Sequence, residues 1–188
     1  MKFKEGRVIE KSYVNKDGRK IGIIFRYPKM SDAKQMLNLI NSMVSENAMI
    51  LINKEKKLKE EKEWLKELVN KNKKSVNIAI VTEIGGKVAG VAELRRYSGR
   101  KVHVANLGIS IEKKYRGLGL ATKSFRILEI IAKKKGVKII DSSYYSGNKP
   151  SERLHKKLGF RIAGKIPKSA RIGKSYSDEI ILYKKVKR

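Results

Sequence analysis

The chain lacks cysteine and has no long hydrophobic run. Without cysteine it cannot form disulfides, a thiolate zinc site or a cysteine nucleophile. No run of about 18 apolar residues occurs, and the basic start (1–14) lacks the apolar stretch of a signal peptide. Two histidines and no cysteine make a metal site improbable. We therefore expect a cytoplasmic protein that needs neither a metal nor a membrane.

Acidic residues are scarce as well. The 188 residues contain 46 Lys and Arg against 18 Asp and Glu, a formal net charge of +28. This surplus favours a polyanionic partner such as nucleic acid, acidic lipid or a phosphate-rich cofactor, although solvated lysines from compositional bias explain it equally well. A dedicated nucleic-acid-binding protein should interleave aromatic and basic residues, but aromatics are only 7% here and the lysines are scattered. Association with nucleic acid or the ribosome stays open as a side activity.

The hydrophobic periodicity predicts one mixed α+β domain spanning residues 1–188. An N-terminal hairpin adds a strand to it, since two β-rich runs flank the turn "NKDG". The expected elements are a hairpin over 7–27, helices from residue 31 and over 55–73, strands over 75–84, 87–97 and 101–111, a helix from 120 to 135, a strand over 137–145, a short helix over 150–159, and closing strands over 160–166 and 178–186.

The stretch "KKYRGLGLATKSF" (113–125) predicts an anion-binding turn. Gly117 and Gly119 allow the backbone to approach a ligand closely, and a helix begins directly after them. Its unpaired N–H groups and positive dipole end, together with Arg116, suit a pyrophosphate. The alternative is that the glycines only permit a sharp turn between a strand and a helix.

Two common phosphate motifs do not fit this turn. A P-loop would need glycine at Lys168, five residues before the only Gly-Lys-Ser sequence, at 173–175. The dinucleotide pattern needs a third glycine where Thr122 stands, although Asp141 lies at about the distance of a ribose ligand. The antiparallel hairpins upstream also argue against a dinucleotide fold.

The chain resembles the GNAT superfamily of N-acetyltransferases in three segments. Arg116, Gly119 and Ala121 match the superfamily pattern Gln/Arg-x-x-Gly-x-Gly/Ala. The segment "NKPSERLHKKLGF" (148–160) resembles its second motif, in the form found in the phosphinothricin acetyltransferase group. The ending 164–186 is similar to the closing hairpin, in which a variable loop precedes the last strand. The resemblance covers about residues 23–186 and implies the GNAT fold, a central mixed sheet flanked by helices.

The resemblance implies acetyl-CoA as the cofactor. Its pyrophosphate would lie on the turn and its pantetheine arm along the preceding strand, with Asn148 on the other side of the arm. The residues so assigned to the cofactor are Ile109, Ser110, Ile111, Arg116, Gly117, Leu118, Gly119, Leu120, Ala121, Thr122, Asn148 and Ser151.

The catalytic residues follow less directly from the resemblance. His155 stands where many members carry a tyrosine as general acid, and histidine can act as acid or base near neutral pH. The carboxylate positions of two related groups are Asn106 and Ser143 here, so neither usual base is present. We expect His155 and Glu93 as the catalytic candidates; their alternatives are a surface histidine and a solvated or ion-paired strand residue.

The acceptor is the least determined feature. The superfamily builds its acceptor pocket from the first two helices and the final hairpin, here about 41–52 and 167–178, with Glu46 as a candidate amine anchor. We expect a primary amine of a small molecule, such as an amino acid, or of a peptide. The alternatives are a protein N-terminus or a ribosomal protein as acceptor, and a domain that senses acetyl-CoA without turnover. A homodimer is compatible with the sequence.

Overall fold

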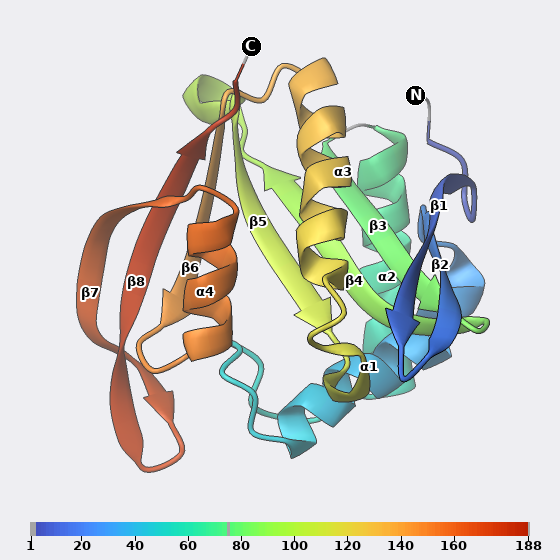
Figure 1. The fold of residues 1–188 in the computed structure, drawn as a ribbon. Coiled ribbons are helices and arrows are strands. Elements are labelled where there is room, and N and C mark those ends of the chain that lie inside the picture. The colour runs from blue at the N-terminus through green and yellow to red at the C-terminus, as the bar shows by residue number, and fades with distance from the viewer. Residues whose placement is uncertain (1–2, 75, 188) are drawn as a thin grey trace.

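The protein is a mixed sheet with two helices on each face (Figure 1). The structure is a computed structural model that describes residues 3–74 and 76–187. The strands are β1 (Val8–Lys16), β2 (Arg19–Arg26), β3 (Asn77–Ile84), β4 (Lys87–Arg96), β5 (Val104–Ile111), β6 (Ile139–Tyr145), β7 (Arg161–Ile172) and β8 (Ser175–Lys185). The helices are α1 (Ala33–Ser45), α2 (Leu58–Lys73), α3 (Leu120–Lys134) and α4 (Lys149–Lys157), with short 3-10 turns η1 (Met30–Asp32), η2 (Gly99–Lys101) and η3 (Lys113–Tyr115).

Two hydrophobic cores hold the layers together. On one face Phe125 and Leu128 of α3 are fully buried against the sheet, and on the other Met36 of α1 and Leu65 of α2 are buried. Each helix therefore presents one apolar stripe to the sheet, as the helical spacing of these residues predicts. Within the described residues, no helix is long and apolar enough to span a membrane.

The sheet order is β1-β2-β3-β4-β5-β6-β8-β7, and β5 with β6 is its one parallel pair. This confirms the mixed α+β class and the additional N-terminal hairpin. The strand expected over 101–111 is shorter than predicted, because residues 99–101 form the turn η2 and β5 begins at Val104. Since β5 and β6 are parallel, a crossover must join them, and α3 supplies it.

The closing hairpin differs from its prediction. The sequence predicts a variable loop before the last strand, yet β7 continues to Ile172 and pairs with β8 almost to the turn. Lys168 accommodates the irregularity between Ile166 and Ala170 with a φ of 51°. Its N–H donates to Asp178 Oδ1 at 2.9 Å, which fixes this bulge on β8. The hairpin is therefore a long twisted ribbon, seen at the left of Figure 1.

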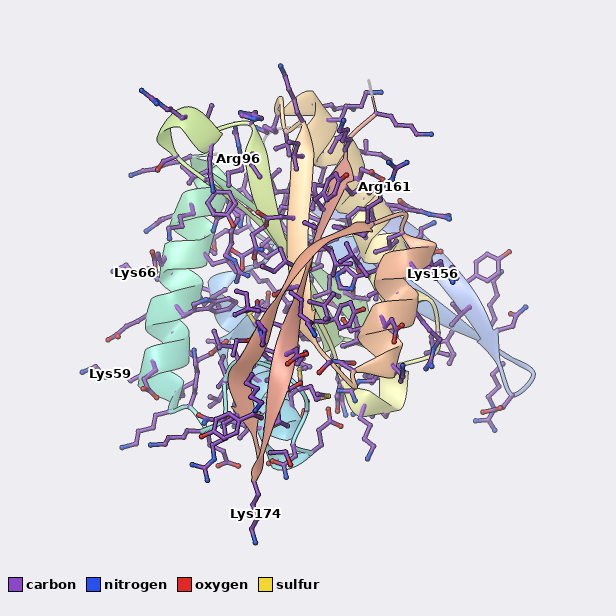
Figure 2. All side chains as sticks on the ribbon, turned by 90° about the vertical axis from the view of Figure 1, so that its left-hand side faces the viewer. Lys59, Lys66, Arg96, Lys156, Arg161 and Lys174 are labelled. Carbon is purple, nitrogen blue, oxygen red and sulfur yellow. The ribbon has the colours of Figure 1, made fainter. Side chains whose placement is uncertain are left out.

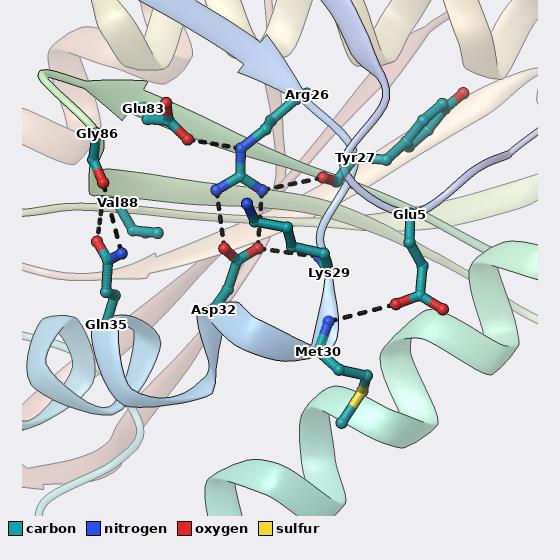
Figure 3. Close-up of polar contacts among 10 residues, drawn as sticks. All are labelled: Glu5, Arg26, Tyr27, Lys29, Met30, Asp32, Gln35, Glu83, Gly86 and Val88. Atoms are coloured by element: carbon teal, nitrogen blue, oxygen red, sulfur yellow. Dashed lines mark hydrogen bonds and ion pairs between the residues drawn. The ribbon is translucent and has the colours of Figure 1, made fainter.

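A buried ion pair fixes α1 against the sheet (Figure 3). Both terminal nitrogens of Arg26 donate to the Asp32 carboxylate at 2.8 Å, and Arg26 Nε donates to Glu83 at 2.7 Å. Asp32 also accepts from the N–H of Lys29 at 2.9 Å, just before α1 begins. Charges buried this deeply are tolerated because they are paired and hydrogen-bonded. The cluster sets where α1 starts and hence where its far end, beside the candidate site, lies.

Candidate active site

The strands β5 and β6 pair at one end and diverge at the other. They are in register only from Val104 to Asn106 and from Ile139 to Asp141. Beyond this point β5 continues to Ile111 and β6 to Tyr145 without pairing to each other, and Figure 1 shows them separating toward the start of α3. We call this divergence the fork, with its narrow end at Asn106 and Asp141. An unpaired strand edge in the middle of a sheet can pair with an extended ligand.

The alternation of β5 determines which backbone groups face the fork. The carbonyl oxygen of Leu107 lies 3.2 Å from Ser142 Oγ of β6, and that of Ile111 accepts from Arg116 Nε at 3.0 Å. On the other edge of β5, the N–H of Glu112 donates to the carbonyl of Ala89 in β4. Because the pattern has a period of two, Leu107, Ile109 and Ile111 turn their backbone groups to the fork. The backbone groups of Ser110 face β4 instead, where Ser110 pairs with Val91.

The glycine turn lies at the wide end of the fork. Gly117 and Gly119 have φ values of 81° and 72°, a region that favours glycine, and a Cβ on either would meet no atom within 4 Å. Gly119 is the N-cap of α3 and provides no side-chain cap, so the first N–H groups of the helix lack that partner. Those groups and the helix dipole form a cradle for an anion. We call residues 116–122 the cradle.

Two predicted site residues, Arg116 and Glu46, are ion-paired with each other. Arg116 Nη2 contacts Glu46 Oε1 just after the end of α1, while its Nε holds the Ile111 carbonyl. The Arg116 side chain is still 40% exposed, so one side of it is free to meet a ligand. The pair joins the segment after α1 to the cradle, and Glu46 is thereby engaged by a cation of the protein itself.

His155 is buried, which overturns its interpretation as a surface histidine. It is 5% exposed, its ring packs edge-on to Phe160, and its Nδ1 lies 2.8 Å from the carbonyl oxygen of Ser151. A carbonyl only accepts, so Nδ1 carries the proton and Nε2 accepts from Ser142 Oγ at 2.9 Å. Burial lowers the pKa of His155, which favours the neutral ring. The histidine contacts β6 of the fork through Ser142 and through Tyr144, whose ring stacks on the imidazole with 5.8 Å between the ring centres.

Asn148 and Ser151 lie at the start of α4. Asn148 caps the helix by accepting from the Ser151 N–H at 3.2 Å, and the Ser151 hydroxyl lies 3.3 Å from His155 Nδ1. Both residues thus help to place His155. We call this side of the fork, covered by α4, the closed face.

The opposite side carries a row of polar groups across three strands. Arg95 Nη2 donates to Asn106 Oδ1 at 2.7 Å, and Asn106 Nδ2 donates to Asp141 Oδ1 at 2.8 Å. The Tyr97 hydroxyl lies 3.4 Å from the same Asp141 oxygen. Burial, first, and then the negative charge of Asp141 raise the pKa of Tyr97, so its hydroxyl stays protonated and can donate. We call this side the open face.

Glu93 lies on the open face but deeper under α2. It is 7% exposed, its Oε1 accepts from Asn77 Nδ2 at 2.7 Å, and Oε2 lies 3.8 Å from Arg95. Burial raises its pKa, an effect that Arg95 and Asn77 partly offset. The raised pKa of the Glu93 carboxyl group is compatible with a role as general base, and its buried hydrogen bond with Asn77 is equally compatible with a structural role.

The structure thus groups the predicted residues in three places. The cradle and the β5 edge border the fork, His155, Asn148 and Ser151 form the closed face, and Glu93 lies on the open face. Sequence reasoning missed the row of Arg95 and Asp141. Its one signal in the sequence is an aspartate inside the strand run "IIDSSYY", where the dinucleotide pattern would place a ribose ligand.

A family model described as "Acetyltransferase (GNAT) domain" matches residues 23–161. An L-methionine sulfoximine/L-methionine sulfone acetyltransferase from Pseudomonas paraeruginosa is 29% identical over 93 residues. That match spans 48% of this chain and 54% of the relative, about half the length of the protein it matches.

Solved acetyltransferases share the fold. One from Salmonella typhimurium, determined with its cofactor acetyl-CoA, superposes with a TM-score of 0.77 at 18% identity, covering 88% of this chain and 95% of that one. A ribosomal-protein-alanine N-acetyltransferase from Brucella melitensis gives 0.75 at 22% identity, covering 86% and 98%. Both superpositions cover more of this chain than the family match does.

Proposed function

Because this chain belongs to the GNAT family of acetyltransferases, we propose that it transfers an acetyl group from acetyl-CoA to the amine of a free amino acid or a similar small molecule. The observation that carries the proposal is the fork, which has an anion cradle at its wide end and two opposite charges, Arg95 and Asp141, at its narrow end. The cytoplasm, where acetyl-CoA is made and used, is the compartment that we propose for this reaction.

The residues of the fork fit acetyl-CoA. The glycine turn leaves open space and unshared N–H groups for a pyrophosphate, and Arg116 adds a half-exposed guanidinium beside it. The unpaired edge from Leu107 to Ile111 rises about 13 Å and can pair with the amides of an extended arm. The cradle, this edge and Asn148 would hold the cofactor, with its acyl end toward Asn106 and Asp141.

The narrow end of the fork supports an amino acid as acceptor. Arg95 and Asp141 lie on either side of the Asn106 amide, and the Arg95 side chain is 54% exposed. A guanidinium is suited to bind a carboxylate and an aspartate to bind an ammonium, so this pair complements a free amino acid at both charged ends. The curated relative that acts on methionine derivatives agrees with this acceptor class.

The chain's own residues can then take defined parts in the reaction. Bound acetyl-CoA supplies a thioester that an amine can attack. The N–H of Ile109, which the strand alternation turns to the fork, is a donor for the oxygen that becomes negative during attack. Asp141 holds and orients the amine of the acceptor, while Glu93 and His155 are the candidates for moving its proton.

An acceptor panel with detection of the released thiol tests this proposal. It should contain free amino acids, among them L-methionine sulfone, the amides of the same amino acids, and peptides with alanine at the N-terminus. Because only the free acids can engage Arg95, their kcat/KM should exceed that of the amides by about 10²-fold. Faster turnover of the peptides would favour a protein N-terminus as acceptor, and no turnover with any acceptor would favour an acetyl-CoA sensor.

Cofactor binding is tested separately by thermal unfolding. Acetyl-CoA at 100 times its dissociation constant should stabilise the protein by about 2.7 kcal/mol. Gly119→Glu should abolish this gain, since it places a carboxylate in the cradle. Gly18→Glu is the matched control, because Gly18 has the same φ of 72° and equally open surroundings in the β1–β2 turn. A wild-type protein without any shift would contradict the assignment of the cofactor.

A further inference from the structure

Basic side chains gather at the end of the molecule opposite the cradle. We propose that this end binds the phosphodiester backbone of a nucleic acid. It consists of three segments, residues 96–104, 132–140 and 183–187, and we call it the basic end. They are the connection from β4 to β5, the end of α3 with the start of β6, and the end of β8, all at the top of Figure 1.

Backbone hydrogen bonds hold the three segments together. The N–H of Lys138 donates to the carbonyl of His103 at 2.8 Å, and the N–H of Val186 donates to the carbonyl of Lys138 at 2.8 Å. Within the first segment, the N–H of Tyr97 donates to Val104 at 3.1 Å. The basic end is therefore built on a hydrogen-bonded backbone, which holds the three segments that carry its cations side by side.

The charge of the basic end is of one sign. The three segments contain ten Lys and Arg and no Asp or Glu, whereas α2, at the left of Figure 2, has five lysines balanced by four glutamates. Lys184 is ion-paired with Glu129 at 2.7 Å, and Arg96 and Lys135 also have partners. The exposed cations are Arg100, Lys101, Lys133, Lys134, Lys138, Lys185 and Lys187.

The basic end cannot be a part of the cofactor site. The cradle precedes α3 and follows β5, while the basic end follows α3 and precedes β5. The 15 residues of α3 separate the two by about 22 Å along the helix. A pyrophosphate on the cradle would therefore not reach these cations, which leaves them available to a second polyanion.

The side chains around the cations favour nucleic acid over a lipid surface. Peripheral membrane proteins combine basic residues with apolar side chains that enter the bilayer. Within the three segments, Val102 at 52% exposure is the single exposed aliphatic side chain, and Ile130, at 59%, lies one turn before Lys133 on α3. Tyr97 is 39% exposed with Lys101 Nζ 5.4 Å from its ring centre, and an aromatic ring beside cations is a platform for stacking a base.

The test measures binding of a fluorescent 20-nucleotide single-stranded RNA by anisotropy at several salt concentrations. The variant replaces Lys133, Lys134, Lys138 and Lys185 by glutamine. A matched control replaces Lys59, Lys62, Lys66 and Lys74, exposed lysines on or beside α2, and has the same net charge. Loss of four phosphate contacts should weaken binding by roughly 10²-fold at 0.15 M salt and make the slope of log K against log salt shallower by about 3.

Three outcomes would overturn the proposal. Equal losses in the variant and its control would show that the charge acts diffusely. Tighter binding to vesicles of phosphatidylserine and phosphatidylcholine than to both the RNA and a duplex DNA of equal length would identify the basic end as a membrane-binding surface. If the wild-type protein binds neither nucleic acid with a dissociation constant below about 10 µM, the proposal is wrong. Acetyl-CoA should not compete with the RNA, so the result is independent of the proposed acetyl transfer.

Discussion

The two faces of the fork contain similar chemistry in opposite environments. On the closed face, His155 and Ser142 are each about 5% exposed and their polar atoms are hydrogen-bonded within the protein. On the open face, Arg95 is half exposed and Asp141 is partly exposed, although both are linked through Asn106. A titratable residue near a cofactor can therefore be part of the packing, and exposure of its polar atoms decides whether it can meet a substrate.

This difference assigns distinct consequences to mutations on the two faces. Removing a group that only meets the acceptor should change kinetics and leave stability nearly unchanged. Removing a buried, hydrogen-bonded group should change stability first, because its partners lose their hydrogen bonds in a place that water does not reach. The open and closed faces can thus be told apart by measuring both quantities on the same variants.

The largest effect is expected on the open face, from Asp141→Asn. The change removes the negative charge that would hold the acceptor ammonium but keeps an amide of the same shape beside Asn106. We expect kcat/KM for the best amino acid acceptor to fall by about 10² to 10³-fold, or 2.7 to 4 kcal/mol. Steady-state kinetics with thiol detection measures this loss.

The control for Asp141 is Glu112→Gln at the other end of β5. Glu112 is ion-paired with Lys114 at 2.8 Å and has no part in the proposed acceptor site, so its loss should change kcat/KM less than threefold. Acetyl-CoA should still stabilise both variants. If Asp141→Asn keeps full activity with every acceptor, the open face does not bind the amine.

A smaller effect, mainly on stability, is expected on the closed face from His155→Gln. Burial lowers the pKa of His155, so the unfolded chain binds more protons than the folded one near pH 6. The stability that the neutral His155 ring contributes is therefore fully present above the unfolded pKa of about 6.5. This stability is lost as the pH falls through the pKa of the folded state. The glutamine variant should lose about 2 kcal/mol at pH 8 and show less of this acid sensitivity.

Urea unfolding between pH 5 and 8 measures this difference, with His103→Gln, at the chain's other histidine, as the control. The turnover of the folded His155→Gln variant should fall less than tenfold if the closed face serves packing. A fall of 10²-fold or more, with the fold intact, would instead show that His155 transfers a proton through Ser142.

The fold was predictable because its signals are local. Turn residues mark the hairpins, and the spacing of Phe125, Leu128 and Ala132 marks the buried stripe of α3, where all three are fully buried. The cradle was recognisable for the same reason, since a short contiguous stretch carries its glycines, its arginine and the start of the helix. Patterns confined to about ten residues need no knowledge of the tertiary structure.

The burial of His155 was visible in the sequence but obscured by its neighbours. Ser151, Leu154, His155 and Leu158 follow the i, i+3, i+4, i+7 spacing of one helical stripe, which predicts an inward position. The adjacent lysines, which lie on the outer side of the short helix, suggested a surface residue instead. Spacing was the better guide here than composition.

Two contacts of the site could not be predicted from the sequence. Asp141 meets Asn106 because of the register of β5 and β6, which is set by the packing of the crossover helix and not by a short turn. Arg116 and Glu46 are 70 residues apart and meet because the buried Arg26–Asp32 pair positions α1. Both depend on tertiary arrangement, for which a single sequence has no pattern.

The smallest effect concerns Glu93, which lies on the open face but is buried like the closed one. Burial raises its pKa, so the folded protein gains from the protonated form and loses this stability as the pH rises through the folded pKa. Glu93→Gln keeps an oxygen that can accept from Asn77 but does not ionise. It should therefore be more stable than the wild type at pH 8, by on the order of 1 kcal/mol, and gain little at pH 4.5. Urea unfolding at both values tests this, with Glu63→Gln on the exposed side of α2 as the control. An equal effect at both pH values would exclude this titration, and a 10²-fold loss of turnover in the stable variant would make Glu93 the general base.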